Sequence, residues 1–340
     1  MKMKLCSIYI IVFFFLSCEN KPKAEINFYY WKTQFKLNET ENECLTFNKT
    51  NKIYTRFFDV GLENKVAVPI AIISFKNFKS NQNIVPVIYI KNEVFVQSDS
   101  LKNNEKTIYL MDLSKNIIKL VDALNLSIKN ETSLLQIDCD WTDKTKTDYF
   151  YFLKLLQKNK KIEVTIRLHQ IKYKEKTGIP PVENAVLMFY NIGHITANDD
   201  NSIYKKENAE KYISRLHEYH LNLKFALPIF SWGQQIRNGK VLALLNKVYT
   251  SDFETDMNFK QTKTNWFVAK KSCFKMGYYF QQNDKVKIEN ISEESLKEIT
   301  KFVSDSYKKI IKEVIFYDLD SKNIQQYDKN IFQKTVSKLH

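Results

Sequence analysis

The stretch Leu134–Asp143, with the sequence LLQIDCDWTD, decides how this chain is interpreted. Leu135 and Ile137 have the apolar side chains of a buried β-strand, and a helical pattern begins a few residues after the stretch. Asp138 and Asp140 lie two positions apart, so they share one face of a strand. Acidic side chains at the end of a strand that leads into a helix are typical of the active-site face of a (β/α) barrel.

The five residues I-D-C-D-W within this stretch resemble the fourth-strand motif of the chitinase-like glycosidases of family eighteen, written D-G-I-D-x-D-W-E. Leu135 stands at the first Asp of that motif and Gln136 at its Gly. Thr142 stands at the Glu that acts as the general acid in the family. The resemblance therefore implies a barrel of the sugar-hydrolase type that lacks the usual catalyst.

Nine segments have the composition of β-strands. Three of them contain the continuous apolar runs IVPVIYI, AVLMFY and FALPIF, which are typical of strands covered on both faces, as in parallel sheets. The nine segments are Ile26–Trp31, Ile53–Val60, Ile84–Ile90, Thr107–Met111, Leu134–Cys139, Ile162–Leu168, Ala185–Tyr190, Lys224–Phe230 and Val314–Tyr317.

Segments with helical spacing lie between many of these strands. The predicted helices are Ile117–Leu126, Asp148–Leu156, Ala209–Tyr219, Gly239–Lys247 and Ser292–Lys312. Such alternation predicts an α/β fold, a (β/α)8 TIM-like barrel. Since a barrel of this kind has eight strands, we expect one of the nine candidates, in the stretch 61–111, to be an addition to the ring.

Residues 252–290 break the alternation. Two aromatic, β-prone runs, Asn265–Lys271 and Cys273–Phe280, are followed by Lys285–Glu289. We interpret this stretch as a β-hairpin or small sheet inserted before the last strand. It either covers the mouth of the barrel and shapes a binding cleft, or it is a structural flap without a ligand. Residues 25–335 are treated as one domain that includes this insertion.

The first residues indicate export. Lys2 and Lys4 precede the apolar run Leu5–Leu16, which is shorter than the roughly 20 residues of a membrane-spanning helix. Cys18 follows a small residue, as in the lipobox of bacterial lipoproteins. We therefore expect residues 1–17 to be a signal peptide, Cys18 to be lipidated, and 18–24 to be a tether to an envelope membrane, in our interpretation the outer one. An uncleaved anchor and a plain secretory signal are the alternatives.

The composition excludes several functions. The formal charge is +14, or +12 without Lys2 and Lys4, but 48 of the 52 basic residues are lysines scattered along the chain, so nucleic-acid binding is not predicted. The six glycines form no G-x-G-x-x-G or P-loop arrangement. No cysteines or histidines have the spacing of a zinc site. We expect neither a metal nor an organic cofactor.

Polar and aromatic residues cluster where the predicted strands end. Because the carboxyl ends of parallel barrel strands lie on one face, these side chains are expected to converge there. The predicted substrate-contacting residues are Arg56, Asp59, Trp141, Arg167, His169, Tyr190, Asn191, Trp232 and Asp318.

Only four arginines occur in the chain, and Arg56 and Arg167 belong to core strands, where an unpaired charge is costly. We predict that carboxylates pair with them, with Asp59, Asp138 and Asp140 as the candidates. A closing salt-bridge layer in the barrel is the alternative, equally compatible with Arg56. The position of Arg167 beside His169 favours a role in the site.

Asp138 and Asp140 are the predicted catalytic acids. At two positions along a strand their side chains are about 6–7 Å apart. This is near the lower limit of about 6.5 Å for the carboxylates of inverting glycosidases. Two acids on one strand do not easily lie on opposite sides of the bond that is cleaved. A third carboxylate is therefore expected, with Asp59, Asp143 and Asp318 as the candidates. Otherwise both are structural acids paired with Arg167 or with lysine.

Aromatic rings suit sugars, because the C–H faces of pyranoses stack on flat rings. The candidates at the barrel mouth are Trp31, Trp141, Tyr190 and Trp232. The alternative is that such rings only plug the rim of the barrel.

The strings YYWKT, RFFDV, QIDCDWT, TIRLHQ, GIPP, MFYN and ALPIFSWG together resemble a family of bacterial envelope lipoproteins with a sugar-hydrolase-like barrel and no assigned activity. We therefore expect a membrane-tethered glycoside hydrolase-like protein that acts on a polysaccharide or other glycan. The alternatives are a non-catalytic carbohydrate-binding or assembly lipoprotein and a purely structural envelope protein. A structural protein would have no cleft, and its strand-end acids would all be tied up in salt bridges.

Overall fold

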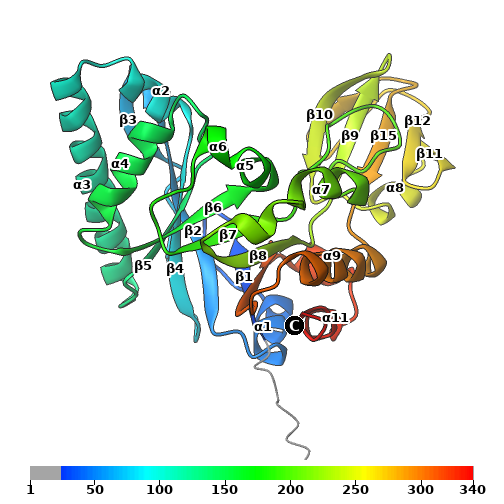
Figure 1. The fold of residues 1–340 in the computed structure, drawn as a ribbon. Helices are drawn as coiled ribbons and strands as arrows, with labels where there is room; N and C mark the ends of the chain where they lie inside the picture. Colours follow the sequence, from blue (N-terminus) through cyan, green and yellow to red (C-terminus); the bar gives the residue numbers. More distant parts are fainter. Residues whose placement is uncertain (1–23, 340) are drawn as a thin grey trace, which may run out of the picture.

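The computed structural model describes residues 24–339, which form a closed barrel of eight parallel strands with helices around it (Figure 1). The strand order is β1-β16-β8-β7-β6-β5-β4-β2, and pairing of β1 with β2 closes the ring. The strands are β1 (Glu25–Tyr30), β2 (Lys52–Glu63), β4 (Asn83–Ile90), β5 (Leu134–Asp138), β6 (Lys161–Arg167), β7 (Asn184–Met188), β8 (Asn222–Pro228) and β16 (Glu313–Tyr317). The predicted TIM-like barrel is confirmed.

Helices of very different length connect these strands. The helices outside the insertion are α1 (Glu39–Phe47), α2 (Glu93–Asp99), α3 (Asn103–Ser127), α4 (Lys146–Leu156), α5 (Leu168–Lys172), α6 (Lys174–Thr177), α7 (Lys206–Ile213), α9 (Glu293–Ser306), α10 (Ser321–Ile324) and α11 (Ile331–Val336), with a 3₁₀ turn at Leu216–Glu218. The start of α9 is as predicted, since the Ser292 side chain accepts from the Ser295 amide at 3.1 Å and caps the helix. That helix ends earlier than expected, at Ser306.

One predicted strand is wrong. Thr107–Met111 belongs to the long helix α3. The buried side chains of this helix, Leu110, Leu113, Ile117 and Val121, follow the helical spacing of three and four residues. Of the run Thr107–Met111, Leu110 faces the core while Ile108 and Met111 are exposed, so the run is one turn of an amphipathic helix and the ninth candidate strand does not exist.

The expected β insertion lies between β8 and β16 and is larger than predicted. It forms a five-stranded sheet in the order β10-β9-β15-β12-β11, beside the barrel in Figure 1, and a separate hairpin of β13 and β14. Its elements are β9 (Trp232–Arg237), β10 (Lys240–Asn246), α8 (Ser251–Glu254), β11 (Phe259–Lys263), β12 (Trp266–Ala269), β13 (Cys273–Lys275), β14 (Tyr278–Phe280) and β15 (Lys285–Glu289).

The predicted helix Gly239–Lys247 is also wrong, because this segment is strand β10. Asn238 and Gly239 both have positive φ, as a two-residue type I′ hairpin turn requires, and Asn-Gly is the dipeptide that most favours this turn. The turn joins β9 to β10, so the insertion begins about twenty residues before the stretch that the sequence indicated.

Charged residues fill the interior of the barrel toward the N-terminal ends of its strands. The Lys224 ammonium lies 2.7 Å from Glu163 and 2.9 Å from Glu313. Gln136 donates to Glu163 at 2.8 Å and accepts from the Tyr29 hydroxyl at 2.8 Å. This network connects the lower barrel to Tyr29, whose ring lies beneath the mouth.

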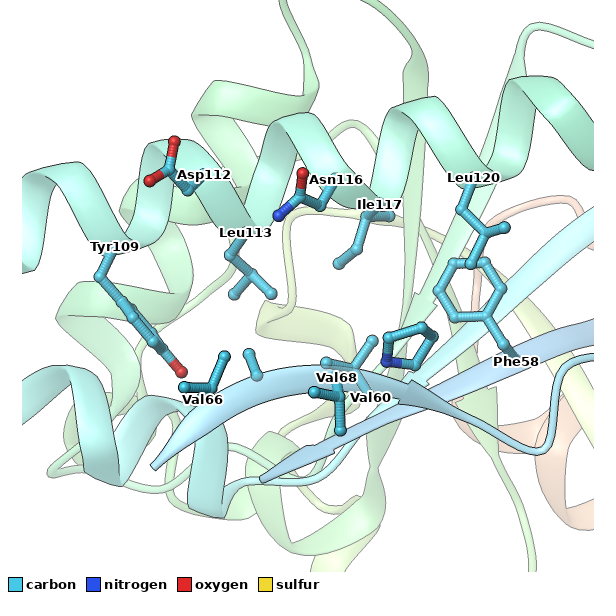
Figure 2. Close-up of a pocket in the computed structure, with 12 residues that line it drawn as sticks. Phe58, Val60, Val66, Val68, Tyr109, Asp112, Leu113, Asn116, Ile117 and Leu120 are labelled. Carbon is cyan, nitrogen blue, oxygen red and sulfur yellow. The ribbon is translucent and has the colours of Figure 1, made fainter. Parts of the chain in front are cut away.

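Strand β2 extends beyond the ring and pairs there with an antiparallel strand, β3 (Val66–Ile70). Figure 2 shows an apolar cavity of about 380 Å³ between this β2–β3 hairpin and α3. Leu113 and Ile117 face it from the helix. Although it is larger than the cavity at the barrel mouth, its carboxylate, Asp112, is exposed, so we place no chemistry there.

The predicted signal peptide, the lipidated Cys18 and the tether up to residue 23 lie outside the described residues. Within residues 24–339 no helix has the length and apolar character needed to cross a membrane.

Candidate active site

A cavity of about 250 Å³ opens at the C-terminal ends of the barrel strands. Strands β1, β2, β4, β5, β6, β7 and β16 or the residues next to them contribute its walls. The lining residues are Tyr29, Trp31, Arg56, Asp59, Tyr89, Asp138, Thr165, Arg167, Met188, Tyr190, Asn191 and Tyr317. Seven of the residues predicted for the site or the barrel mouth are among them, namely Trp31, Arg56, Asp59, Asp138, Arg167, Tyr190 and Asn191.

Asp138 is the buried acid of this cavity. It is the last residue of β5 and only 7% exposed. Burial raises the pKa of its carboxyl to about 6, although the nearby Arg167 opposes the shift. Within the part of the chain that the structure describes, the hydrogen bond to this carboxylate is donated by Thr165 Oγ1 at 2.6 Å. A carboxyl group with this pKa is present in both protonation states near neutral pH, as general acid–base catalysis requires.

The predicted pairing of arginines with carboxylates is confirmed at two positions. Arg56 pairs with Asp59 through Nε at 2.6 Å and through a second, shorter contact from its Nη2. Arg167 holds Asp140 in the same two-point manner, at 2.7 and 3.2 Å. The Asp140 side chain, predicted as a catalytic acid, is 44% exposed and is not among the residues that line the cavity. Both carboxylates therefore have a fixed cation, in contrast to Asp138.

Aromatic rings form one wall of the cavity. Tyr190 stacks on Tyr317 with ring centroids 5.2 Å apart, and Trp31 meets Tyr317 edge-on at 5.6 Å. Tyr29 contacts Trp31 at 6.0 Å, and the Arg56 guanidinium lies 5.7 Å from the Trp31 ring. Such contacts keep the rings in fixed orientations, and a sugar face needs a fixed flat surface to stack on.

Two predicted site residues are directed away from the cavity. Trp141 is only 1% exposed, stacks on Tyr149 at 5.1 Å and donates from Nε1 to the Thr177 carbonyl at 2.9 Å. It is a core residue, so the expectation that it stacks on sugar is corrected. Asp318 is buried between Lys247 at 3.3 Å and the Asn323 amide at 2.6 Å, and does not line the cavity.

Two others lie near the mouth without lining it. His169 is exposed on α5, two residues after Arg167. Trp232 begins the insertion, and its indole nitrogen donates to Glu289 at 2.8 Å. Its ring packs edge-on against Phe230 at 5.4 Å. Contact of either residue with a substrate stays a prediction.

Thr142, which replaces the family's general acid, does not line the cavity. Its amide donates to Thr145 Oγ1 at 3.0 Å, next to the start of α4. No carboxylate lies at this position of the sequence, and the carboxylates that line the cavity are Asp59 and Asp138.

The sequence interpretation did not assign a site role to Tyr29, Tyr89, Thr165, Met188 or Tyr317. Two of them, Thr165 and Tyr89, lie beside Asp138 on the neighbouring strands, so the pairing of these strands would have identified them. Thr165 follows Val164, the β6 partner of Ile137, as Asp138 follows Ile137 on β5. Tyr89 is the direct partner of Asp138 on β4. Once the register of β4, β5 and β6 is known, neighbours of a mouth-facing acid follow from it.

No protein-family model matches the chain, and no curated protein matches its sequence. Solved structures do match its fold. The spore cortex-lytic enzyme SleL of Bacillus cereus aligns with a TM-score of 0.55 at 9% identity, over 94% of this chain and 75% of that one. A class V chitinase of Nicotiana tobaccum, solved in complex with NAG4, gives a TM-score of 0.52 at 9% identity, over 94% of this chain and 99% of that one.

A chitinase-like agglutinin of Robinia pseudoacacia gives a TM-score of 0.50 at 10% identity, over 92% of this chain and 98% of that one. At such low identity the likeness concerns the fold alone. The chain thus has a TIM barrel similar in fold to those of chitinases and of a chitinase-like agglutinin, and the fold that the I-D-C-D-W motif implied is confirmed.

Proposed function

We propose that the chain binds a glycan at the mouth of its barrel and hydrolyses it, with Asp138 as the acid. The observation that carries this proposal is a buried carboxyl group, with a pKa raised to about 6, in a cavity walled by aromatic rings. The chitinase-like relatives in fold support a sugar as the ligand, since one of them was solved with NAG4 bound.

In this mechanism the protonated Asp138 donates its proton to the glycosidic oxygen as the bond from that oxygen to the anomeric carbon breaks. A water molecule then adds to the anomeric carbon, and its proton goes to a carboxylate. Asp59 is the second carboxylate that lines the cavity, where it is paired with Arg56, and it is the proposed acceptor of this proton. Tyr190, Tyr317 and Trp31 hold the sugar face, and Arg167 donates to its hydroxyl groups.

The location is part of the proposal. Cys18 carries acyl chains and fastens the domain to a bacterial envelope membrane, most simply the outer one, so that the substrate is a polysaccharide of the envelope or of the surroundings. The sequence around Cys18 supports this. Mass measurement of the N-terminal peptide of the exported protein tests it, because a Cys18 without acyl chains would contradict the tether.

A panel of chitin oligosaccharides, peptidoglycan and plant polysaccharides tests the activity. We expect new reducing ends from at least one member, and we expect Asp138→Asn to abolish their release while the fold is kept. Asp112→Asn is the matched control, because Asp112 is a carboxylate beside the apolar cavity of Figure 2 and is outside the barrel mouth. If no member is bound or cleaved, the proposed function is wrong.

One observation favours a second function, glycan binding without turnover. Thr142 stands where the family has its acid, and both Asp59 and Asp140 are held by arginines. Binding of a glycan that Asp138→Asn leaves unchanged, without release of reducing ends, would favour this function over hydrolysis.

A further inference from the structure

The N-terminal end of the barrel carries lysines that pair with no described carboxylate. All of them are exposed and lie in loops that lead into barrel strands, or at the first residue of a strand. They are Lys49 before β2, Lys129 before β5, Lys158 and Lys161 at β6, and Lys308, Lys309 and Lys312 before β16. None of the seven forms an ion pair within residues 24–339.

Acidic residues at this end do not balance these lysines. Glu131 and Glu183 are the exposed acids in the loops before β5 and β7, and Asp305 is exposed at the end of α9, just before the loop that leads to β16. Glu25 is neutralised by Lys52 at 2.8 Å, and Asp122 by Lys160 at 2.6 Å. The described part of this face therefore has a clear excess of positive charge.

The parallel barrel brings these lysines onto one face. The lysine-rich composition of the chain does not by itself explain this clustering. The whole chain is rich in lysine, and exposed unpaired lysines also occur on the inserted sheet, for example Lys260 and Lys270. However, all strands of the ring run in one direction, so the loops before β2, β5, β6 and β16 end at the same pole. Positive charges on a single face add their potentials.

The start of β1 lies on the same face. Glu25 is the first residue of β1, and it follows Cys18 by seven residues, which span at most about 25 Å when fully extended. A lipid on Cys18 therefore keeps this face close to the surface of the bilayer. Bacterial membranes contain anionic phospholipids, and their attraction for lysine acts within about one Debye length.

We propose that this lysine face binds anionic phospholipid headgroups and holds the barrel upright, with its cavity directed away from the membrane. The proposal rests on the tether of the proposed function. It deepens that function, because an upright barrel presents the mouth to a glycan outside the bilayer. A nucleic acid is disfavoured as the partner, since the loops lack arginines and the anchor supplies a lipid surface beside them.

Lysine acetylation followed by mass spectrometry tests the orientation. The exported full-length protein is reconstituted on vesicles of phosphatidylcholine alone or of equal parts phosphatidylcholine and phosphatidylglycerol. We expect the seven lysines to react about fivefold more slowly on the anionic vesicles. Lys240, Lys260, Lys270 and Lys271 of the insertion are expected to react equally on both. The protection should disappear in about 0.5 M salt, which shortens the Debye length to about 4 Å.

Two variants of equal charge change provide the control. Lys158→Glu with Lys161→Glu, Lys308→Glu and Lys309→Glu should remove the protection of Lys49, Lys129 and Lys312. The same four substitutions at Lys240, Lys260, Lys270 and Lys271 should leave that protection intact. These residues are exposed, so both variants are expected to fold, and thermal unfolding checks this.

The outcomes separate the two proposals. Acyl chains on Cys18 without a difference between the vesicles would overturn the lipid-binding face and leave the tether standing. Protection without acyl chains would refute the tether and support the face. Protection by duplex DNA but not by anionic vesicles would overturn lipid binding in favour of nucleic-acid binding.

Discussion

The two ends of the barrel handle charge differently. Toward the N-terminal ends, the buried Lys224 lies between Glu163 and Glu313, so each interior charge has a partner of opposite sign. At the mouth, Asp138 is buried against Thr165 and has no cation of its own among the described residues. Burial raises the pKa of both Glu163 and Asp138, but Lys224 bonds directly to Glu163, whereas Asp138 is hydrogen-bonded to a neutral hydroxyl group. Asp138 also lines a cavity, so the proposed function places its chemistry at the mouth.

The largest effect is expected from Asp138→Asn. If Asp138 is the acid, the substitution removes the donated proton and should lower kcat by about 10²–10⁴-fold. The hydrogen bond from Thr165 is kept by the amide oxygen, so the fold should persist. Steady-state kinetics on a cleaved glycan measure this. An unchanged kcat would show that Asp138 is not the catalytic acid, and the proposed contrast between the two ends of the barrel would then be wrong.

Lys224→Met tests the compensated end. It leaves Glu163 and Glu313 buried without their shared cation, and such a loss costs about 3–5 kcal/mol of unfolding free energy. Urea denaturation measures it, with the exposed Lys240→Met as control. A cost below about 1 kcal/mol would mean that this network is not what holds the lower barrel together.

The pH dependence of the unfolding free energy tests the raised pKa of Asp138 at the barrel mouth. The pKa of Asp138 is about 6 in the folded chain and about 3.9 when unfolded, so the folded state binds the extra proton between these values. Stability should therefore fall as pH rises from about 4 to 6, by up to about 3 kcal/mol. Asp138→Asn should remove this part of the slope. Identical curves for both proteins would refute the raised pKa.

Arg167→Gln should weaken glycan binding about tenfold, because it removes charged donors from the cavity and frees Asp140. Its effect on stability should be small, since Asp140 is half-exposed. Calorimetry measures the affinity. Arg237→Gln is the matched control, because Arg237 holds Asp284 in the same two-point geometry within the insertion. Equal losses in both variants would argue against a site role for Arg167.

The smallest effect is expected at the exposed lysines of the lower face. Replacing Lys158, Lys161, Lys308 and Lys309 one at a time by Gln should change stability by less than about 0.5 kcal/mol and leave glycan binding as it is. Thermal unfolding and calorimetry check this. A large loss would show that these lysines serve the fold, and the contrast with the mouth would weaken.

The barrel was predictable because its strands are apolar runs of the length that a parallel sheet buries on both faces. The convergence of Arg167 and Asp138 followed from their places at strand ends, whereas Arg56 lies within β2. The sequence did not predict which way the side chains just beyond a strand point, because their orientation depends on residues that are distant in the sequence. Trp141 is turned into the core by Tyr149 and by the carbonyl of Thr177.

The interior charges escaped the sequence interpretation for a similar reason. Glu163 and Lys224 lie in β6 and β8, but nothing local shows that they meet, since β7 separates their strands and only the curvature of the barrel brings their side chains together. The prediction of a helix at Gly239–Lys247 was wrong because a turn signal in the sequence was not used. The Asn238–Gly239 pair specified a hairpin, and the run of apolar residues after it was taken for a helix.

The inserted sheet enters and leaves the barrel at one place, since Trp232, its first strand residue, is paired with Glu289, its last. Glu289 fastens this junction by accepting from Trp232 and Gln234. A module whose two ends adjoin can be removed or exchanged without parting the strands of its host. Exchange of the inserted sheet would leave the pairing of the ring strands intact, and under the proposed function it would change which glycans reach the barrel mouth.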